Sequence, residues 1–496
     1  MKMFSDRIKD KIKEYLPDQG NTDGNDRRAE KKKNGRIARA RRRIRIAEAL
    51  CAALPVGFMA VFGTKYIIRP AVDPDSAATR NTIIYDEISK YAIEGDIVDR
   101  NGDMIMGNAT PGIGAYANDP ENRSYAYLLG YYTVNSNHEN MYGLRGNLKD
   151  YSLFKLDKNN KGATTYLTTD TALQDYAYNE LLNGQEGSIT VLDNNTGEIL
   201  CLASQSTIDY DVNDTNAFVS DTTPNGQFRR GTYENDPPGS TFKVITAAAA
   251  LTMMEEEGLG DDFLHYYDTG TFTPQGDSWM ISNYQDEVFG DCDLNEAMRY
   301  SINCYFANLG IQVGADKLNE IAERFMLGKD IEIPFLCTLH SSIDIENDTP
   351  ATIAQTAFGQ GNTEITPLHM AMIAQAVANN GVMLQPNIVS TIKSGRIPYY
   401  TSHRKKLSET MSASVNDKLK AAMHEAALEY GFDEQNYGMV YAKTGTAECA
   451  NDRIHCYMIG FTDSVSFCLS FNTMRASSEL YDEALRLVSW LNNNNY

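Results

Sequence analysis

The pattern of apolar and polar positions is most regular in the second half of the chain, where it predicts both strands and helices. Five apolar runs have the length of strands: 188–194, 197–204, 439–447, 455–461 and 464–471. The first two are joined at Asn195-Thr196, which indicates a hairpin. Five further segments are predicted as helices: 241–251, 294–309, 367–380, 417–430 and 479–491. Because strands lie at both ends of this region, we predict an α+β fold in which helices flank a largely antiparallel sheet.

The pattern is weaker between residues 69 and 165. Apolar and polar positions alternate only in short pieces there, and Gly, Asn and Tyr are frequent, as in Gly112–Tyr132. Short strands separated by loops are the expected result. We therefore predict a small β-rich domain at 69–165, called the pedestal here, ahead of the main domain at 166–496.

An apolar segment close to the start of the chain, Ile46–Ile68, is long enough for a membrane span. Twenty-three helical residues reach about 34 Å, which exceeds the ~30 Å of a bilayer core. Eleven Lys and Arg but one acid, Glu30, lie between Arg27 and Arg45. A buried soluble helix would not explain this charge, and a cleaved signal peptide has a shorter basic region. The positive-inside rule then predicts that 1–45 is a cytoplasmic basic tail, that 46–68 is a single transmembrane helix, and that the rest is extracytoplasmic.

Charge beyond the apolar segment excludes nucleic acid as a partner of the main domain. The whole chain has a net charge of -21, but residues 66–496 alone hold 28 basic and 58 acidic residues. Such an acidic surface repels phosphate backbones. The basic tail adjoins the apolar segment, so contact with anionic lipid explains it better than nucleic acid does. The cysteines form no CxxC pair and the histidines have no metal-ligand spacing, so we predict no metal site and no cofactor.

Ser240 and Lys243 are the first residues that indicate chemistry. They lie in the sequence Ser-Thr-Phe-Lys, after Pro237-Pro238-Gly239 and at the start of a predicted helix. Positions i and i+3 share one face of a helix. A lysine whose pKa is lowered by burial can take the proton of the serine and make it a nucleophile.

The same four-residue spacing occurs at three other serines: Ser152, Ser390 and Ser402. Their contexts differ, because Ser390 is in a β-branched run, Ser402 is in a charged loop, and Ser152 precedes residues that end a helix. Only Ser240 has a helix breaker before it and an apolar helix after it.

Two further motifs supply the remaining groups. Ser301-Ile-Asn303 offers a second hydroxyl for proton transfer and a carboxamide that can hold a substrate amide. Lys443-Thr444-Gly445-Thr446, on a predicted strand, offers a positive charge, hydroxyls for a carboxylate, and a glycine that leaves room for a bound peptide. Ser301 follows Ser240 by 61 positions, and Lys443 follows Asn303 by 140. The order SxxK, SxN and KTG is typical of penicillin-binding proteins and class A β-lactamases.

With these motifs the sequence resembles the class B (monofunctional) penicillin-binding proteins, from about residue 92 to the end. Besides the three motifs, several stretches carry the resemblance: GDIVDRNG (95–102), LTTDTALQDYA (167–177), DNNTGEILCLAS (193–204) and AFGQGNTEITPLHMA (357–371). The resemblance implies a penicillin-binding transpeptidase (serine β-lactamase-like) fold for 166–496 and a peptidoglycan D,D-transpeptidase activity inhibited by β-lactams.

The resemblance also implies a role for each motif residue. Ser240 would be the nucleophile, Lys243 its base, and Ser301 with Lys443 a proton relay. The substrate-binding residues would be Asn303 for the donor peptide, and Thr444, Gly445 and Thr446 for its carboxylate. The partners would be a D-Ala-D-Ala donor stem peptide, an amine acceptor from a second stem, and a polytopic lipid-linked glycan polymerase.

Other functions stay open at this point. A D,D-carboxypeptidase uses the same serine with water as the acceptor, and a non-catalytic β-lactam-binding sensor or scaffold would keep the site without turnover. A β-lactamase normally has neither a span nor a pedestal. Cys449 and Cys456 flank the turn after the KTGT motif, so a disulfide between them and two free thiols are alternative hypotheses.

Overall fold

The computed structural model describes residues 34, 38, 42, 93–107, 120–130, 132–135, 138–141, 143–152, 155–205, 230–345, 349–449, 453–472, 474 and 476–496. The expected membrane span at 46–68 lies outside them. Across these described ranges, no helix is both long and apolar enough to cross a membrane. Residues 85–496 form one compact unit, whose elements follow.

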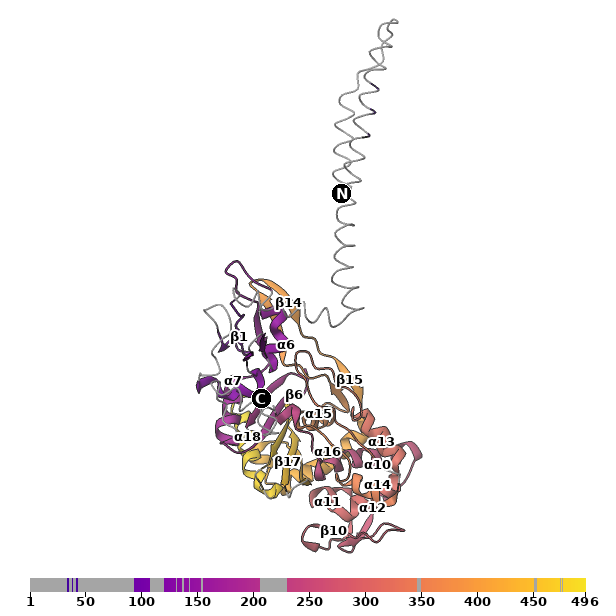
Figure 1. Cartoon of the computed structure of the whole chain (residues 1–496). Helices are drawn as coiled ribbons and strands as arrows, with labels where there is room; N and C mark the ends of the chain where they lie inside the picture. Colours follow the sequence, from indigo (N-terminus) through magenta and orange to yellow (C-terminus); the bar gives the residue numbers. More distant parts are fainter. Residues whose placement is uncertain are drawn as a thin grey trace, which may run out of the picture. The chain divides into compact units, whose positions relative to one another are not determined.

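The main sheet has five antiparallel strands in the order β16-β17-β18-β6-β7 (Figure 1). Their bounds are β6 Gly187–Asp193, β7 Ile199–Gln205, β16 Tyr441–Cys449, β17 Arg453–Phe461 and β18 Val465–Phe471. The hairpin β6–β7 therefore pairs with the last three strands of the chain, with Thr190 opposite Cys468 and Lys443 opposite Ile459. This confirms the predicted antiparallel sheet.

Helices cover both faces of this sheet. α15 (Pro367–Ala378) packs on β6, β17 and β18, while α7 (Thr171–Tyr176) and the π-helical turn η4 (Ala177–Leu182) pack on β7. α18 (Tyr481–Asn493) packs on η4 and lies across the sheet from α15 (Figure 1). Every residue of β18 is buried as a result, which explains why its sequence is a nearly continuous apolar run.

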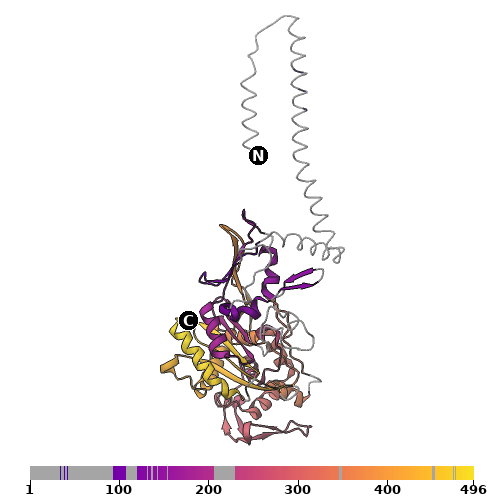
Figure 2. The same cartoon turned by 60° about the vertical axis from the view of Figure 1, so that its left-hand side comes forward.

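A helical lobe is formed mainly by residues between β7 and β12 (Val382–Leu384), and it is described here with α16 and α17, which follow β12 in the chain. Its helices are α9 Arg230–Tyr233, α10 Lys243–Glu257, α11 Leu294–Arg299, α12 Asn303–Val313, α13 Ala315–Arg324, α14 Pro350–Ala357, α16 Ala413–Glu429 and α17 Glu434–Tyr437. α10 is the centre of the lobe, because α12, α13 and α16 all pack on it and its first ten residues are buried. The short turns and strands beside it are η5 Gly239–Phe242, η6 Asp261–Leu264, β8 Tyr266–Asp268, β9 Thr271–Phe272, β10 Ile281–Ser282, η7 Tyr284–Asp286 and β11 Gly290–Cys292. Figure 2 shows β8 to β11 at one end of the unit.

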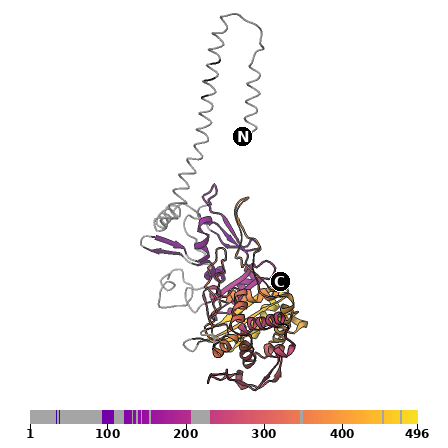
Figure 3. The same ribbon diagram turned by 90° about the vertical axis from the view of Figure 1, so that its right-hand side faces the viewer.

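A second, smaller sheet lies at the opposite end of the unit (Figure 3). Its order is β14-β13-β5-β1-β2, with β1 Ile97–Val98, β2 Met104–Met106, β5 Thr164–Leu167, β13 Val389–Ser394 and β14 Ile397–Thr401. Strands from the predicted pedestal thus pair with strands more than 200 positions later, and β5 contains the predicted boundary at residue 165. The domain division itself stays a prediction.

Helices also occur where the sequence predicts mainly short strands. The other elements of this part are η3 Pro120–Tyr125, α5 Ala126–Leu129, β3 Tyr132–Asn135, β4 His138–Met141 and α6 Gly143–Ser152; β12 Val382–Leu384, β15 Lys406–Glu409 and η10 Ser477–Leu480 complete the chain. Leu144 and Leu148, one turn apart on α6, are both buried. The glycines of this segment hide its helical spacing, because glycine weakens any helix prediction.

Candidate active site

Ser240 lies in the turn η5, which runs directly into α10 at Lys243. Pro237 and Pro238 precede it and lack backbone N–H groups, so the helix cannot extend backward through them. Ser240 and Lys243 are therefore one helical turn apart, as the spacing predicts. Ser240 is half-buried, and its hydroxyl makes no hydrogen bond to any residue that the structure describes.

Two glycines let the serine turn lie directly on strand β16. A Cβ atom on Gly239, whose φ is +54°, would lie 2.5 Å from the carbonyl oxygen of Thr446. A Cβ on Gly445 would lie 2.6 Å from the carbonyl oxygen of Pro238. Neither distance is possible without a shift of the backbone. In the structure, the turn before Ser240 therefore occupies the space beside Gly445. Any room that this glycine leaves for a bound peptide comes in addition to that contact.

Lys243 is the first residue of α10 and is fully buried. Its Nζ donates to three oxygens: the Ser301 carbonyl at 2.7 Å, the Ser301 hydroxyl at 3.1 Å and Asn303 Oδ1 at 2.7 Å. Burial, and then the charge of Lys443, hold the pKa of Lys243 well below the usual value for lysine. A buried lysine of this kind can be a neutral amine near pH 7 and act as a base.

Ser301 lies at a break that the sequence pattern does not reveal. The predicted helix at 294–309 is in fact two helices, α11 and α12, and Ser301 adopts a left-handed backbone with φ +55° between them. Such a conformation costs a non-glycine residue about 1 kcal/mol or more. The buried side chain of Ile302 anchors the break. The turn presents both the carbonyl and the hydroxyl of Ser301 to Lys243.

Lys443 reaches the same hydroxyl from strand β16. Its fully buried Nζ lies 2.9 Å from Ser301 Oγ. The three motifs, from a helix start, a helix break and a strand, therefore meet at one oxygen atom.

Asn303, the first residue of α12, has both ends of its carboxamide engaged. Its Oδ1 accepts from Lys243, and its Nδ2 donates to the carbonyl of Ser282 at 3.1 Å. The side chain is half-buried. It links the lysine to the β9–β10 hairpin, and a substrate amide would have to compete with one of these bonds.

Tyr430, at the end of α16, is a site residue that the motif search missed. Its hydroxyl lies 3.3 Å from Lys443 Nζ and 3.2 Å from Thr444 Oγ1. Tyr430 is buried, and so is Thr444. Nothing in the sequence marks a tyrosine thirteen positions before the lysine as its partner.

Thr446 is the more accessible of the two threonines in the strand motif. It is half-buried, and its Oγ1 accepts from the backbone N–H of Ser477 at 3.2 Å. A bound carboxylate can reach this hydroxyl more easily than that of Thr444, which is turned toward Tyr430.

A comparison with protein families decides what this arrangement is. Residues 187–467 match the model of the penicillin-binding protein transpeptidase domain. The chain belongs to this family. The match begins at β6 and ends in β18, so it contains both edges of the main sheet and all three motifs of the transpeptidase domain.

The names of similar curated proteins are consistent with this family assignment. The chain is 26% identical over 370 residues to the peptidoglycan D,D-transpeptidase PbpA of Mycolicibacterium smegmatis, and this alignment covers 67% of this chain and 72% of the relative. It is 30% identical over 291 residues to PbpA of Mycobacterium tuberculosis, covering 54% of this chain and 57% of the relative. A ceftriaxone acyl-enzyme complex of penicillin-binding protein A from M. tuberculosis has the same fold, with a TM-score of 0.70 and 23% identity over 82% of this chain and 99% of the other.

The three similar serine–lysine pairs lie outside the transpeptidase site. Ser152 ends α6, Ser390 lies in strand β13, and Ser402 follows β14. Their contexts in the structure are those that the sequence indicates, and none of them is part of a helix start.

The disulfide considered between Cys449 and Cys456 is not formed. The two strands pair as expected, but the register sets Cys456 opposite Thr446 and Cys449 opposite Arg453. Cys456 is a buried free thiol. The alternative of free thiols is therefore correct for Cys456.

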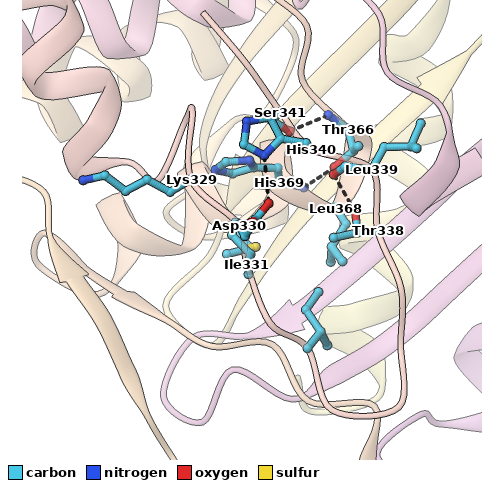
Figure 4. A pocket seen from close by; sticks show the side chains of 12 residues that line it. Lys329, Asp330, Ile331, Thr338, Leu339, His340, Ser341, Thr366, Leu368 and His369 are labelled. Atoms are coloured by element: carbon cyan, nitrogen blue, oxygen red, sulfur yellow. Dashed lines mark hydrogen bonds and ion pairs between the residues drawn. The ribbon is translucent and has the colours of Figure 1, made fainter. Parts of the chain in front are cut away.

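A cavity of about 100 Å³ lies away from the transpeptidase motifs, beside the start of α15 (Figure 4). His369 lies on its wall and is hydrogen-bonded through Nε2 to the carbonyl of Phe325 at 2.7 Å. Burial lowers the pKa of His369 to about 4, so this imidazole is neutral at pH 7. None of the predicted site residues lines the cavity.

Proposed function

We propose that this chain is a serine D,D-transpeptidase that cross-links peptidoglycan stem peptides through an acyl-enzyme on Ser240 and is inhibited by β-lactams. One observation carries the proposal: the hydroxyl of Ser301 lies within hydrogen-bond distance of both Lys243 and Lys443. The contact of η5 with β16 supports it further, because it brings the Ser240 turn to the same strand.

Lys243 is the proposed general base. An ammonium has three protons, and the three oxygens around Lys243 match them. A neutral amine keeps two of these bonds and has a lone pair left for the proton of Ser240. The lowered pKa of Lys243 makes the neutral form accessible.

Ser240 then attacks the carbonyl carbon between the two terminal D-alanines of the donor. The C–O bond to Ser240 forms while the carbonyl oxygen becomes an oxyanion. We assign the oxyanion to the backbone N–H groups of Ser240 and Thr446, which belong to the two segments in contact through Gly239 and Gly445. In this proposal Asn303 holds the donor amide, while the Thr444, Gly445 and Thr446 segment receives the terminal carboxylate.

Departure of the terminal D-alanine requires a proton on its nitrogen. We propose that Ser301 delivers it, because its hydroxyl lies between the two lysines and can pass on a proton from either. The amine of a second stem peptide then attacks the acyl-enzyme. It gives up its proton along the same path, and Ser240 leaves as the hydroxyl.

We also propose a domain organisation and a membrane topology for the chain. Residues 1–45 are a cytoplasmic tail, 46–68 a single transmembrane helix, 69–165 the pedestal, and 166–496 the penicillin-binding domain, on the outer side of the cell membrane. A polytopic lipid-linked glycan polymerase would be contacted through the helix and the pedestal.

The test is product analysis with the purified full-length chain. It is given a stem pentapeptide that ends in D-Ala-D-Ala, together with an amine acceptor. We expect D-alanine release coupled to a cross-linked product, with none from Ser240→Ala. Ser402→Ala is the matched control, because it removes a serine of the same spacing from a loop, and it should keep full activity.

Other products would point to other functions. Hydrolysed tetrapeptide with no cross-link would identify a D,D-carboxypeptidase. Penicillin labelling of Ser240 without turnover of any stem peptide would identify a β-lactam-binding sensor or scaffold. Activity that survives in Ser240→Ala would contradict the proposed nucleophile.

A further inference from the structure

Three side chains with metal-binding groups converge beside the Ser240 turn, outside the catalytic residues. Glu234, Asp236 and His455 each have a ligand atom within 4.8 Å of the other two. His455 Nδ1 and Asp236 Oδ2 are 3.1 Å apart. Donor atoms that share one tetrahedral metal ion at 2.0–2.2 Å lie about 3.3–3.6 Å apart, so this pair needs only a small adjustment to hold a common ion.

Each of the three comes from a segment that is held in place. Glu234 directly follows helix α9, and Asp236 forms an isolated bridge with Ile365. His455 is fully buried in β17, opposite Ala447 of β16. A site made from three fixed segments needs little reorganisation to accept an ion.

The buried carboxylate of Glu234 independently favours a bound cation. Its side chain is only 9% exposed. Its Oε1 accepts hydrogen bonds from Arg230 and Asn472, each at 2.6 Å. Its Oε2 is buried and has no hydrogen-bond partner within the described residues. A buried carboxylate oxygen without a donor is costly, and a bound cation removes that cost.

The charges around the site also favour a bound cation. Arg230 forms ion pairs with Glu186 and Glu234. Together with Asp236, these groups are three carboxylates and one guanidinium, so their formal charge is two negative units while His455 is neutral. A divalent cation would balance the group.

We propose that Glu234, Asp236 and His455 bind one divalent transition-metal ion, with zinc as the best match. One imidazole nitrogen and two carboxylate oxygens are a ligand set that zinc accepts, with water in the fourth position. Magnesium and calcium prefer oxygen ligands alone. The sequence does not signal the site, because His455 is more than 200 positions from the two acids.

The ion would link the segment that precedes Ser240 to strand β17, which pairs with the KTGT strand β16. Asp236 precedes Ser240 by four residues, and His455 is next to Cys456, which pairs with Thr446. Metal bound here would therefore hold η5 against β16. The proposal concerns binding and stability, so it stands or falls separately from the transpeptidase activity.

The experiment uses the purified full-length chain after treatment with a chelator. Zinc binding is measured by titration and by elemental analysis, and cobalt(II) replaces zinc for absorption spectra. We expect a single equivalent of metal, a higher melting temperature with zinc, and visible cobalt bands without a thiolate charge-transfer band. Asp236→Asn and His455→Gln should each weaken binding at least about tenfold.

His265→Gln is the matched control. His265 and Asp291 form a pair with the same 3.1 Å separation, but both are exposed, and no third ligand joins them among the residues that the structure describes. This variant should bind zinc like the wild type. If the site variants do not fold, the cobalt spectrum of the wild type still decides the matter.

Three results would overturn the proposal. The first is absence of zinc and cobalt binding by the folded wild-type chain, which would leave a histidine–carboxylate ion pair only. The second is a thiolate charge-transfer band, which would assign the metal to cysteines. The third is undiminished binding by folded Asp236→Asn and His455→Gln.

Discussion

The ammonium nitrogen of Lys443 lies 2.9 Å from the hydroxyl oxygen of Ser301. Lys243 reaches the same oxygen at 3.1 Å from the start of α10. Two buried ammonium groups that share one acceptor repel each other, so the pair is most stable when one of them is neutral. Lys243 is that one, because burial and the charge of Lys443 both lower its pKa.

Asn303→Asp should move the pH dependence of acylation to higher pH. Asn303 Oδ1 accepts from Lys243 at 2.7 Å, and a carboxylate in its place would stabilise the ammonium and raise the pKa of Lys243. Acylation requires the neutral amine, so its rate should rise with pH at a higher midpoint than in the wild type. The measurement is the penicillin acylation rate of the full-length chain across pH.

Asn303→Ala is the comparison for this variant. It removes one acceptor of the ammonium without adding charge, so the midpoint should move to lower pH. Shifts of both variants in the same direction would argue against Lys243 as the base.

The stability of the fold should also depend on Lys243. Its pKa is lowered in the folded state from the ordinary 10.5, so the unfolded chain binds more protons. The free energy of unfolding should therefore rise with pH between the folded-state pKa and 10.5, by up to about 1.4 kcal/mol per pH unit for this group. Lys243→Met should lose this part of the slope. Melting temperatures across pH test it, and equal slopes for both proteins would refute it.

Tyr430→Phe should slow acylation about tenfold while the chain stays folded. The change removes the hydroxyl that contacts Lys443 and Thr444 at 3.3 and 3.2 Å, which costs about 1–2 kcal/mol. Tyr430 acts through these residues, so the loss should fall on the acylation rate constant more than on the melting temperature.

Tyr481→Phe is a suitable control for Tyr430→Phe. The two rings lie 5.0 Å apart, and within the described residues Tyr481 makes no hydrogen bond to Lys443 or Thr444. This variant should acylate at the wild-type rate. A purely structural role for Tyr430 would instead lower the melting temperature of Tyr430→Phe and spare its acylation rate.

Gly445→Ala should disrupt the contact between η5 and β16. The added Cβ would lie 2.6 Å from the carbonyl oxygen of Pro238 and 3.0 Å from the backbone nitrogen of Thr241. We expect a loss of about 1–3 kcal/mol in stability and a much larger fractional loss of penicillin labelling. Gly260→Ala has open space around its Cβ and should change neither quantity. Normal labelling of Gly445→Ala would show that the contact is dispensable.

Much of the fold could be predicted from the sequence because it depends on local signals. The strands β6, β7, β16, β17 and β18 appear as apolar runs with short connections, and α15 begins at Pro367 after the cap Thr366. The proposed nucleophile and base share one helix turn, so the spacing of Ser240 and Lys243, together with the helix breaker before them and the apolar helix after them, was sufficient to predict them as a pair.

The remaining features depend on contacts between distant segments. The helix break at Ser301 is not visible, because α11 and α12 together keep a helical spacing of apolar residues. Two contacts arise only when β16 and β17 pack on the helical lobe. They are the hydrogen bond between Tyr430 and Lys443 and the ion pair between His455 and Asp236. No local pattern of residues encodes them.

Peptide mapping by mass spectrometry can locate the residue that penicillin acylates. The full-length chain is incubated with penicillin, digested, and searched for the acyl adduct. We expect a single adduct, on the Ser240 hydroxyl, which is absent from Ser240→Ala and forms much more slowly in Ser301→Ala. An adduct on any other residue, or none on the folded wild-type chain, would contradict this expectation.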